Sequence, residues 1–110
     1  MVVIIPTEKM KMRTLYQFVE EAMEINNLRE VEIARKLDIS KQRLHTLKKR
    51  RDGNLPPESI SNLADLLSID PIVIHAAMMY NQSEKQKTRD YWRELPSRVL
   101  LAGFGQIASA

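Results

Sequence analysis

Apolar residues recur at helical spacing along most of the chain. The first such pattern predicts a helix from about residue 12 to residue 26, which Asn26 and Asn27 then end. Its apolar positions follow an i, i+3, i+4, i+7 spacing and are Leu15, Phe18, Val19 and Ala22. A second, shorter pattern predicts a helix from Glu30 to Leu37, whose acidic residues lie near the positive end of the helix dipole.

Capping residues and prolines predict where three further helices begin. Ser40 is a suitable N-cap for a third helix that reaches about Arg51, and the sequence Asp52-Gly53-Asn54 is typical of a turn after it. Pro56-Pro57-Glu58 opens a fourth helix, and Asp70-Pro71 opens a fifth. The inward positions of these last two helices are expected to be Ile60, Leu63, Ala64, Leu67, Ile74, Ala77 and Met78.

The two ends of the chain lie outside this regular pattern. After Asn81-Gln82-Ser83 a polar stretch predicts one more helix up to Leu95, which Pro96 is expected to break. Residues 99–110 are apolar but too short to span a bilayer, and they suit a lid over the core or a dimer contact. The apolar start of residues 1–9 is expected to be a loose arm or a short edge strand. No strand-like alternation of useful length occurs, so the predicted fold class is all-α.

Length and composition indicate one globular domain rather than two. The chain has 110 residues, of which 44% are hydrophobic, and it contains no cysteine. The absence of cysteine excludes a disulfide framework or a thiolate metal site and suits the cytoplasm. His45 and His75 have no companions at ligand spacing, so no metal is expected, and His75 is expected at the surface. No phosphate-binding glycine loop, nucleophile motif or acid/base pair appears, so we expect no catalysis, cofactor or small-molecule substrate.

Positive charge is concentrated in one segment of the chain. The net charge is +3, but residues 29–53 hold nine basic and four acidic residues, whereas residues 54–80 hold three acidic residues and no basic one. Within the basic segment, residues 41–51 (KQRLHTLKKRR) carry six basic side chains and no acidic one. Exposed helix faces usually mix both signs, so this run favours an acidic partner such as nucleic acid.

The residues before the basic run have the pattern of a helix-turn-helix. Ala34 supplies the small side chain that a closely crossing second helix requires. Asp38 suits the turn, because its short side chain tolerates a left-handed backbone. Ile39, Leu44 and Leu47 can then seal the second helix against the first. The segment from residue 30 to residue 51 is therefore predicted to be two short helices packed through a tight turn.

Residues 30–82 resemble the five-helix DNA-binding domain of the phage lambda repressor-like (XRE-type) regulators. The match is carried by the basic run, by the LADLLSIDP segment that begins the last two helices, and by Ile33, Ala34, Leu37, Ile39, Ser40, Leu44 and Leu47. The resemblance implies that the second and third helices form the helix-turn-helix and that the third lies in the major groove. Small phage-encoded regulators share this layout, so a phage or prophage origin is expected. Asp38 replaces the usual glycine, and Glu30 replaces a neutral polar residue.

Helical geometry selects a reading face on the third helix. With Leu44 and Leu47 inward, Gln42, His45 and Thr46 point outward, where side chains of this motif meet base edges. Lysine and arginine favour guanine or phosphate, and Ser40 with the first helical amides suits a phosphate. The predicted DNA-binding residues are Ser40, Lys41, Gln42, Arg43, His45, Thr46, Lys48, Lys49, Arg50 and Arg51.

The expected function is a sequence-specific double-stranded DNA-binding transcriptional regulator, a repressor that acts as a homodimer. The DNA-binding domain is expected over residues 8–82 and a possible dimerisation segment over residues 83–110. Tyr80, Tyr91 and Trp92 are expected to pack or to join the dimer rather than to stack on bases. The alternative is a helical protein-interaction module, such as an antitoxin or a phage inhibitor that docks a host protein.

Overall fold

The computed structural model describes residues 12–109, with side chains described as far as residue 99. This part of the chain is all-α, as predicted, and forms no strand. Its helices are α1 (Leu15–Asn26), α2 (Glu30–Leu37), α3 (Lys41–Lys49), α4 (Pro57–Leu67), α5 (Pro71–Gln82) and α6 (Gln86–Ser109). The predicted N-terminal arm or strand lies outside the described residues.

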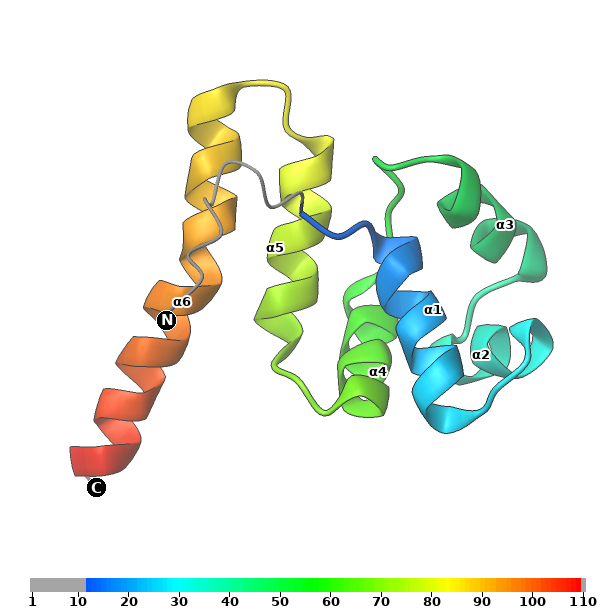
Figure 1. Ribbon diagram of the computed structural model, residues 1–110, viewed down its shortest axis with the longest axis horizontal. Coiled ribbons are helices and arrows are strands. Elements are labelled where there is room, and N and C mark those ends of the chain that lie inside the picture. Colours follow the sequence, from blue (N-terminus) through cyan, green and yellow to red (C-terminus); the bar gives the residue numbers. More distant parts are fainter. Residues whose placement is uncertain (1–11, 110) are drawn as a thin grey trace, which may run out of the picture.

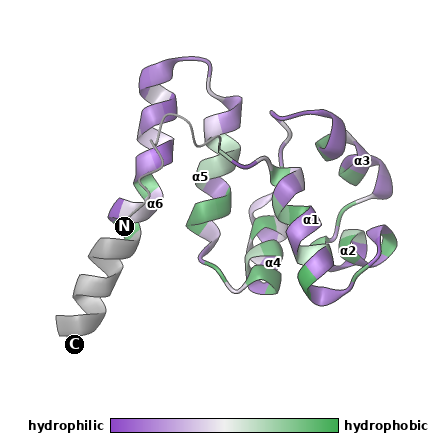
Figure 2. Cartoon of the chain, in the orientation of Figure 1, coloured by the Kyte–Doolittle hydropathy of each residue, from purple (hydrophilic) through white to green (hydrophobic). Residues whose placement is uncertain are grey.

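Helices α1 to α5 surround one apolar core, and α6 lies alongside α5 (Figure 1). The apolar sides of α1, α2, α4 and α5 are visible as green segments in Figure 2. The predicted inward residues are confirmed as buried, except that Leu67 is only partly covered. Met78 fills the core, and Leu55, which belongs to no helix, adds a buried side chain that helical periodicity did not identify.

Three helices end in the same way, at a residue with a left-handed backbone. Asn27, Asp38 and Ser68 have φ angles of 53°, 56° and 56° and follow α1, α2 and α4. At each end two crossed backbone hydrogen bonds close the last turn; after α2 they run from Asp38 N to Arg35 O (3.1 Å) and from Ile39 N to Ala34 O (3.0 Å). The predicted roles of Asn27 and Asp38 are confirmed, whereas Ser68 was not anticipated.

Side-chain caps fix the helix starts. Ser40 accepts a hydrogen bond from Arg43 N at 3.0 Å, and Asp70 caps α5, as predicted. The first helix begins at Leu15 rather than near residue 12, because Thr14 and Gln17 form a capping box. The Thr14 hydroxyl accepts from Gln17 N at 3.2 Å, and the Gln17 side chain accepts from Thr14 N at 2.8 Å.

Polar side chains tie neighbouring helix ends together. The hydroxyl of Ser59, a residue that is 1% exposed, donates to the carbonyl of Leu37 at 2.6 Å. The Asn62 amide donates to Lys36 O at 3.2 Å, so two otherwise unpaired carbonyls at the end of α2 gain partners from α4. These bonds hold α2, and with it the turn into α3, at a fixed position on the core.

The prediction that Pro96 breaks the last helix is wrong. Helix α6 runs from Gln86 to Ser109 with Pro96 inside it. A proline removes one backbone hydrogen bond from a helix and crowds the preceding turn, but the bonds on either side remain. The ion pair between Glu94 and Arg98, at 2.9 Å, spans the proline and favours the helical course.

Aromatic side chains join α6 to α5. Trp92 is partly buried, and its ring packs edge-on against His75 (centroids 5.7 Å apart) and Tyr91 (5.0 Å). The packing role expected for Trp92 is confirmed. His75, expected at the surface, is half-buried in this cluster instead. Within residues 12–109, no helix combines the length and the apolar character that a membrane crossing requires.

Candidate nucleic-acid interface

Helix α3 has one narrow buried side and a wide exposed one. Leu44 and Leu47 are each 3% exposed and pack into the core. The helix thus uses two side chains for folding and leaves the rest in solvent. The exposed residues of α3 are Lys41, Gln42, Arg43, His45, Thr46, Lys48 and Lys49. The predicted division of this helix into an inward and an outward side is confirmed.

The turn before α3 places its first residues at the surface. Ala34 is 4% exposed and sits in α2 where α3 crosses, so the small side chain occupies the position that the sequence predicted. Asp38 turns the chain and Ser40 caps α3, as described above. The Ser40 hydroxyl accepts from the Arg43 amide, and the exposed residues Lys41 and Gln42 begin the helix beside it, an arrangement suited to a phosphate.

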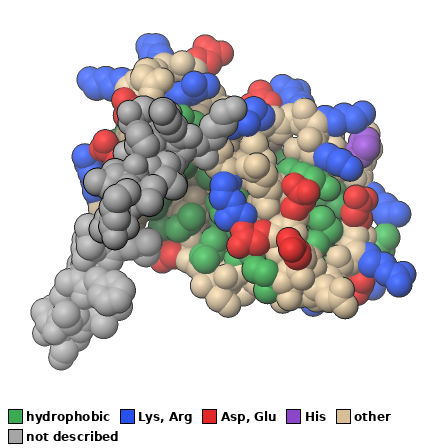
Figure 3. All heavy atoms as spheres, in the orientation of Figure 1, with side chains coloured by type: hydrophobic (Ala, Val, Ile, Leu, Met, Phe, Trp, Pro, Cys, Tyr) green, Lys and Arg blue, Asp and Glu red, His purple; other side chains and the backbone are tan. Residues whose placement is uncertain are grey.

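The surface around α3 is basic. Figure 3 shows Lys and Arg side chains gathered over the end of the molecule that carries α3. The Thr46 hydroxyl donates to the Gln42 carbonyl at 3.0 Å, so this polar group is already used within the helix. Its methyl group is then the part of Thr46 left for a partner, whereas the Gln42 amide stays available for hydrogen bonding.

Lys48 lies at the edge of this surface rather than at its centre. Its ammonium group is 6.0 Å from the centroid of the Tyr16 ring on α1. Burial raises the pKa of the Tyr16 hydroxyl, and the charges of Glu30 and Glu20 raise it further. Lys48 therefore lies on the side of α3 that faces α1.

The end of α3 departs from the prediction. The helix ends at Lys49, two residues before Arg51, and Arg50 adopts an extended backbone (φ −124°, ψ 127°). The turn that follows brings Gly53 against Leu47, where an added Cβ would lie 2.6 Å from Leu47 Cδ2. If α3 continued to Arg51, Gly53 could not lie against Leu47 and Leu55 could not be buried. These two contacts explain why the helix ends at Lys49.

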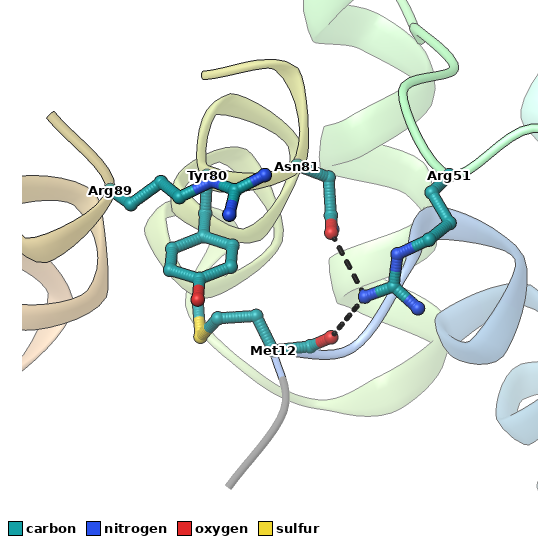
Figure 4. Close-up of a pocket in the computed structure, with 5 residues that line it drawn as sticks. All are labelled: Met12, Arg51, Tyr80, Asn81 and Arg89. Atoms are coloured by element: carbon teal, nitrogen blue, oxygen red, sulfur yellow. Dashed lines mark hydrogen bonds between the residues drawn. The ribbon is translucent and has the colours of Figure 1, made fainter. Parts of the chain in front are cut away.

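Arg50 and Arg51 take different directions beyond the helix. Arg50 forms a bidentate ion pair with Asp52, with Nε to Oδ1 and Nη2 to Oδ2 both at 3.1 Å. Arg51 extends toward α5, where its Nη2 donates to Met12 O at 3.4 Å and to Asn81 Oδ1 at 3.3 Å (Figure 4). Arg51 therefore links the turn after α3 to Met12 and to α5. The run of basic residues in the sequence did not indicate this role.

The structure brings the predicted residues of α3 onto one exposed surface, with Arg50 paired and Arg51 directed toward α5. It also reveals Arg89 of α6 beside Arg51, a basic residue outside the segment that sequence analysis singled out. The only sequence signal for Arg89 was the modest basic excess of residues 81–110. No protein-family model, curated protein or solved structure matches this chain.

Proposed function

We propose that this protein is a sequence-specific double-stranded DNA-binding regulator with the lambda repressor-like arrangement of helices, and that α3 is its recognition helix. The observation that carries the proposal is the split of α3 into two buried leucines and seven exposed polar side chains. A helix that needed only to fold would not concentrate uniform positive charge on its open side. The tight turn at Asp38 supports the same assignment.

The dimensions of α3 suit the major groove. An α-helix with its side chains is about 10–12 Å wide, close to the groove width of about 12 Å. Gln42 lies in the first turn of α3, where it can pair with the acceptor and donor of adenine, and Thr46 follows one turn later for contact with a thymine methyl. Lys49 and Arg50 lie at the end of the helix, where phosphate is the nearer partner.

We propose that the protein acts as a homodimer. The nine residues of α3 span about 13 Å at 1.5 Å per residue, which covers a half-site of a few base pairs and gives modest affinity alone. Two recognition helices about 34 Å apart would read a palindromic site. Helix α6 extends past α5 on the side of the molecule away from α3, so pairing through α6 would leave α3 free (Figure 1).

Sedimentation tests the dimer. Deletion of residues 97–110 should convert the dimer to a monomer, because Val99, 42% exposed, begins the apolar part of α6. A truncated chain that dimerises with unchanged affinity would show that this segment is not the interface. Repression by occupying a promoter is the proposed mode of regulation.

The alternative is a protein-interaction module such as an antitoxin or a phage inhibitor. Ile25 and Val31, at the two sides of the turn between α1 and α2, favour it because they are 61% and 44% exposed. Salt separates the two functions, because neutralised DNA phosphates release counterions, whereas an apolar contact is insensitive to salt.

The experiment that tests the proposal is selection from a pool of random duplexes, followed by binding measurements across a salt series. A regulator of this type should enrich a related set of sites, and its affinity should fall steeply with added salt. Failure to enrich any sequence, together with no binding to duplex DNA at low salt, would contradict the proposal.

A further inference from the structure

A second basic site lies where α5, α6 and the turn after α3 meet. A pocket of about 440 Å³ opens there to solvent, and it is lined by Met12, Arg51, Tyr80, Asn81 and Arg89. Figure 4 shows the side chains of Arg51 and Arg89 on either side of Asn81. We call it the arginine pocket. Its volume falls within the range of roughly 300–1,000 Å³ that is typical of sites for small ligands.

Arg51 is held in the pocket by one nitrogen. Both of its hydrogen bonds, to Met12 O and to Asn81 Oδ1, come from Nη2. Asn81 is itself fixed, because its amide donates to Arg13 O at 3.0 Å and to Ala77 O at 2.9 Å. Its Oδ1 is therefore oriented toward Arg51. Among the described residues, the other nitrogens of the guanidinium group make no hydrogen bond and can donate to a ligand.

Arg89 is held in a similar way from the opposite side. Its Nε donates to Ser83 O at 2.8 Å, and its guanidinium carbon lies 5.6 Å from the centroid of the Tyr80 ring. These two contacts fix the plane of the group while its terminal nitrogens stay unused among the described residues. Side chains fixed before a ligand arrives lose less conformational entropy on binding.

Among the described residues, the lining of the pocket carries two positive charges and no negative one. Two guanidinium groups on one pocket repel each other, so a bound anion would be favoured over the empty site. Arginine donates two parallel hydrogen bonds to carboxylates and to phosphates, and of these two a phosphate carries the larger negative charge to set against two guanidinium groups. The Tyr80 side chain adds a further polar group to the same pocket.

We propose that the arginine pocket binds a phosphate group. The phosphate is carried either by the DNA backbone, if the duplex reaches past the turn after α3, or by a small phosphorylated molecule. Because Arg51 lies two residues after the end of the proposed recognition helix, a free phosphate in the pocket would compete with DNA for this side chain. Only the DNA source of the phosphate rests on the proposed function; the pocket itself does not.

The first arm of the test uses inorganic phosphate and the full chain without DNA. Phosphate is titrated at constant ionic strength while the Nε–H signals of Arg51 and Arg89 are followed by NMR. Saturable shifts are expected, and Arg89→Gln should weaken binding at least about tenfold, the effect of losing a hydrogen bond between charged groups. Arg93→Gln is the matched control, because Arg93 lies on the same helix, pairs with Asp90, precedes the proposed dimer segment and does not line the pocket.

The second arm uses a random DNA duplex. If the backbone supplies the phosphate, Arg89→Gln should lower affinity and reduce the slope of log K against log salt by about 0.9, while Arg93→Gln changes neither. If a small molecule supplies it, Arg89→Gln leaves duplex binding unchanged while the first arm responds. Circular dichroism checks that both variants fold.

A response to Arg89→Gln but not to Arg93→Gln in either arm supports the arginine pocket. If the two variants bind phosphate equally well and also bind the duplex equally well, the proposal of a phosphate site in the arginine pocket is overturned. A chain that binds no duplex but still binds phosphate through Arg89 would overturn the proposed function alone, so the two failures are distinguishable.

Discussion

Asp52 holds Arg50 through two parallel hydrogen bonds of 3.1 Å at the end of the proposed recognition helix. The hydrogen bond from Arg50, reinforced by its charge, lowers the pKa of the Asp52 carboxyl below its ordinary value. A carboxyl with a lowered pKa stabilises the fold above its ordinary pKa, and this contribution is lost as the pH falls. The two side chains are 65% and 50% exposed, so the pair matters more for what Arg50 can bind than for stability.

Asp52→Asn is expected to tighten duplex binding, because the carboxylate competes with DNA phosphate for Arg50. The release of Arg50 should steepen the slope of log K against log salt by about 0.9 for one added phosphate contact. Asp65→Asn is the control, since Asp65 is exposed on α4, away from α3. Equal changes in both variants would indicate a general charge effect rather than the release of Arg50.

Ala34→Leu is expected to destabilise the domain, because α3 crosses α2 at this buried residue and leaves no room for a larger side chain. Overpacking of this kind costs about 1–3 kcal/mol of the free energy of unfolding. Urea denaturation measures it, with Arg35→Leu at the next, exposed position as the control. A fully stable Ala34 variant would be inconsistent with the helix crossing.

Ser68→Gly is expected to stabilise the protein more than Asp38→Gly. Both residues have left-handed backbones, which cost an L residue about 1–2 kcal/mol, but aspartate tolerates the conformation better than serine does. Glycine removes that cost and loses about 0.5–1 kcal/mol of backbone entropy in return. Thermal unfolding ranks the two variants. Only Asp38→Gly should also strengthen DNA binding, because it removes a negative charge beside α3.

Pro96→Ala is expected to stabilise α6. The alanine restores one backbone hydrogen bond and relieves the crowded turn, a gain of up to about 3 kcal/mol in a helix interior. Helix content from circular dichroism should rise, whereas Ser97→Ala next to it should change little. No gain in helix content or melting temperature would show that the helix is interrupted at Pro96 in solution.

The buried side of each helix was predictable because helical periodicity alone decides which residues face the core. Leu44 and Leu47 followed from this spacing, and with them the exposure of Gln42 and Thr46. The turn at Asp38 was predictable because few residue types tolerate a left-handed backbone. These features depend on neighbours within a few residues along the chain.

The remaining features depend on contacts between distant segments. The end of α3 is set by the approach of Gly53 to Leu47, and the direction of Arg51 is set by Met12 and Asn81. The position of Arg89 depends on how α6 packs on α5, which no local pattern specifies. The exposed side of α3 was therefore predictable from the sequence, whereas the arginine pocket was not.

Binding measurements on Gln42 and Lys49 variants test whether α3 reads DNA. Each variant is measured on the selected duplex and on random duplex across a salt series, with Arg93→Ala as the control for lost charge. Gln42→Ala should cost about 1–3 kcal/mol on the selected duplex and little on random DNA. Lys49→Ala should weaken both alike and reduce the salt slope by about one unit. Unchanged duplex binding by both variants would contradict the proposal that α3 is a recognition helix.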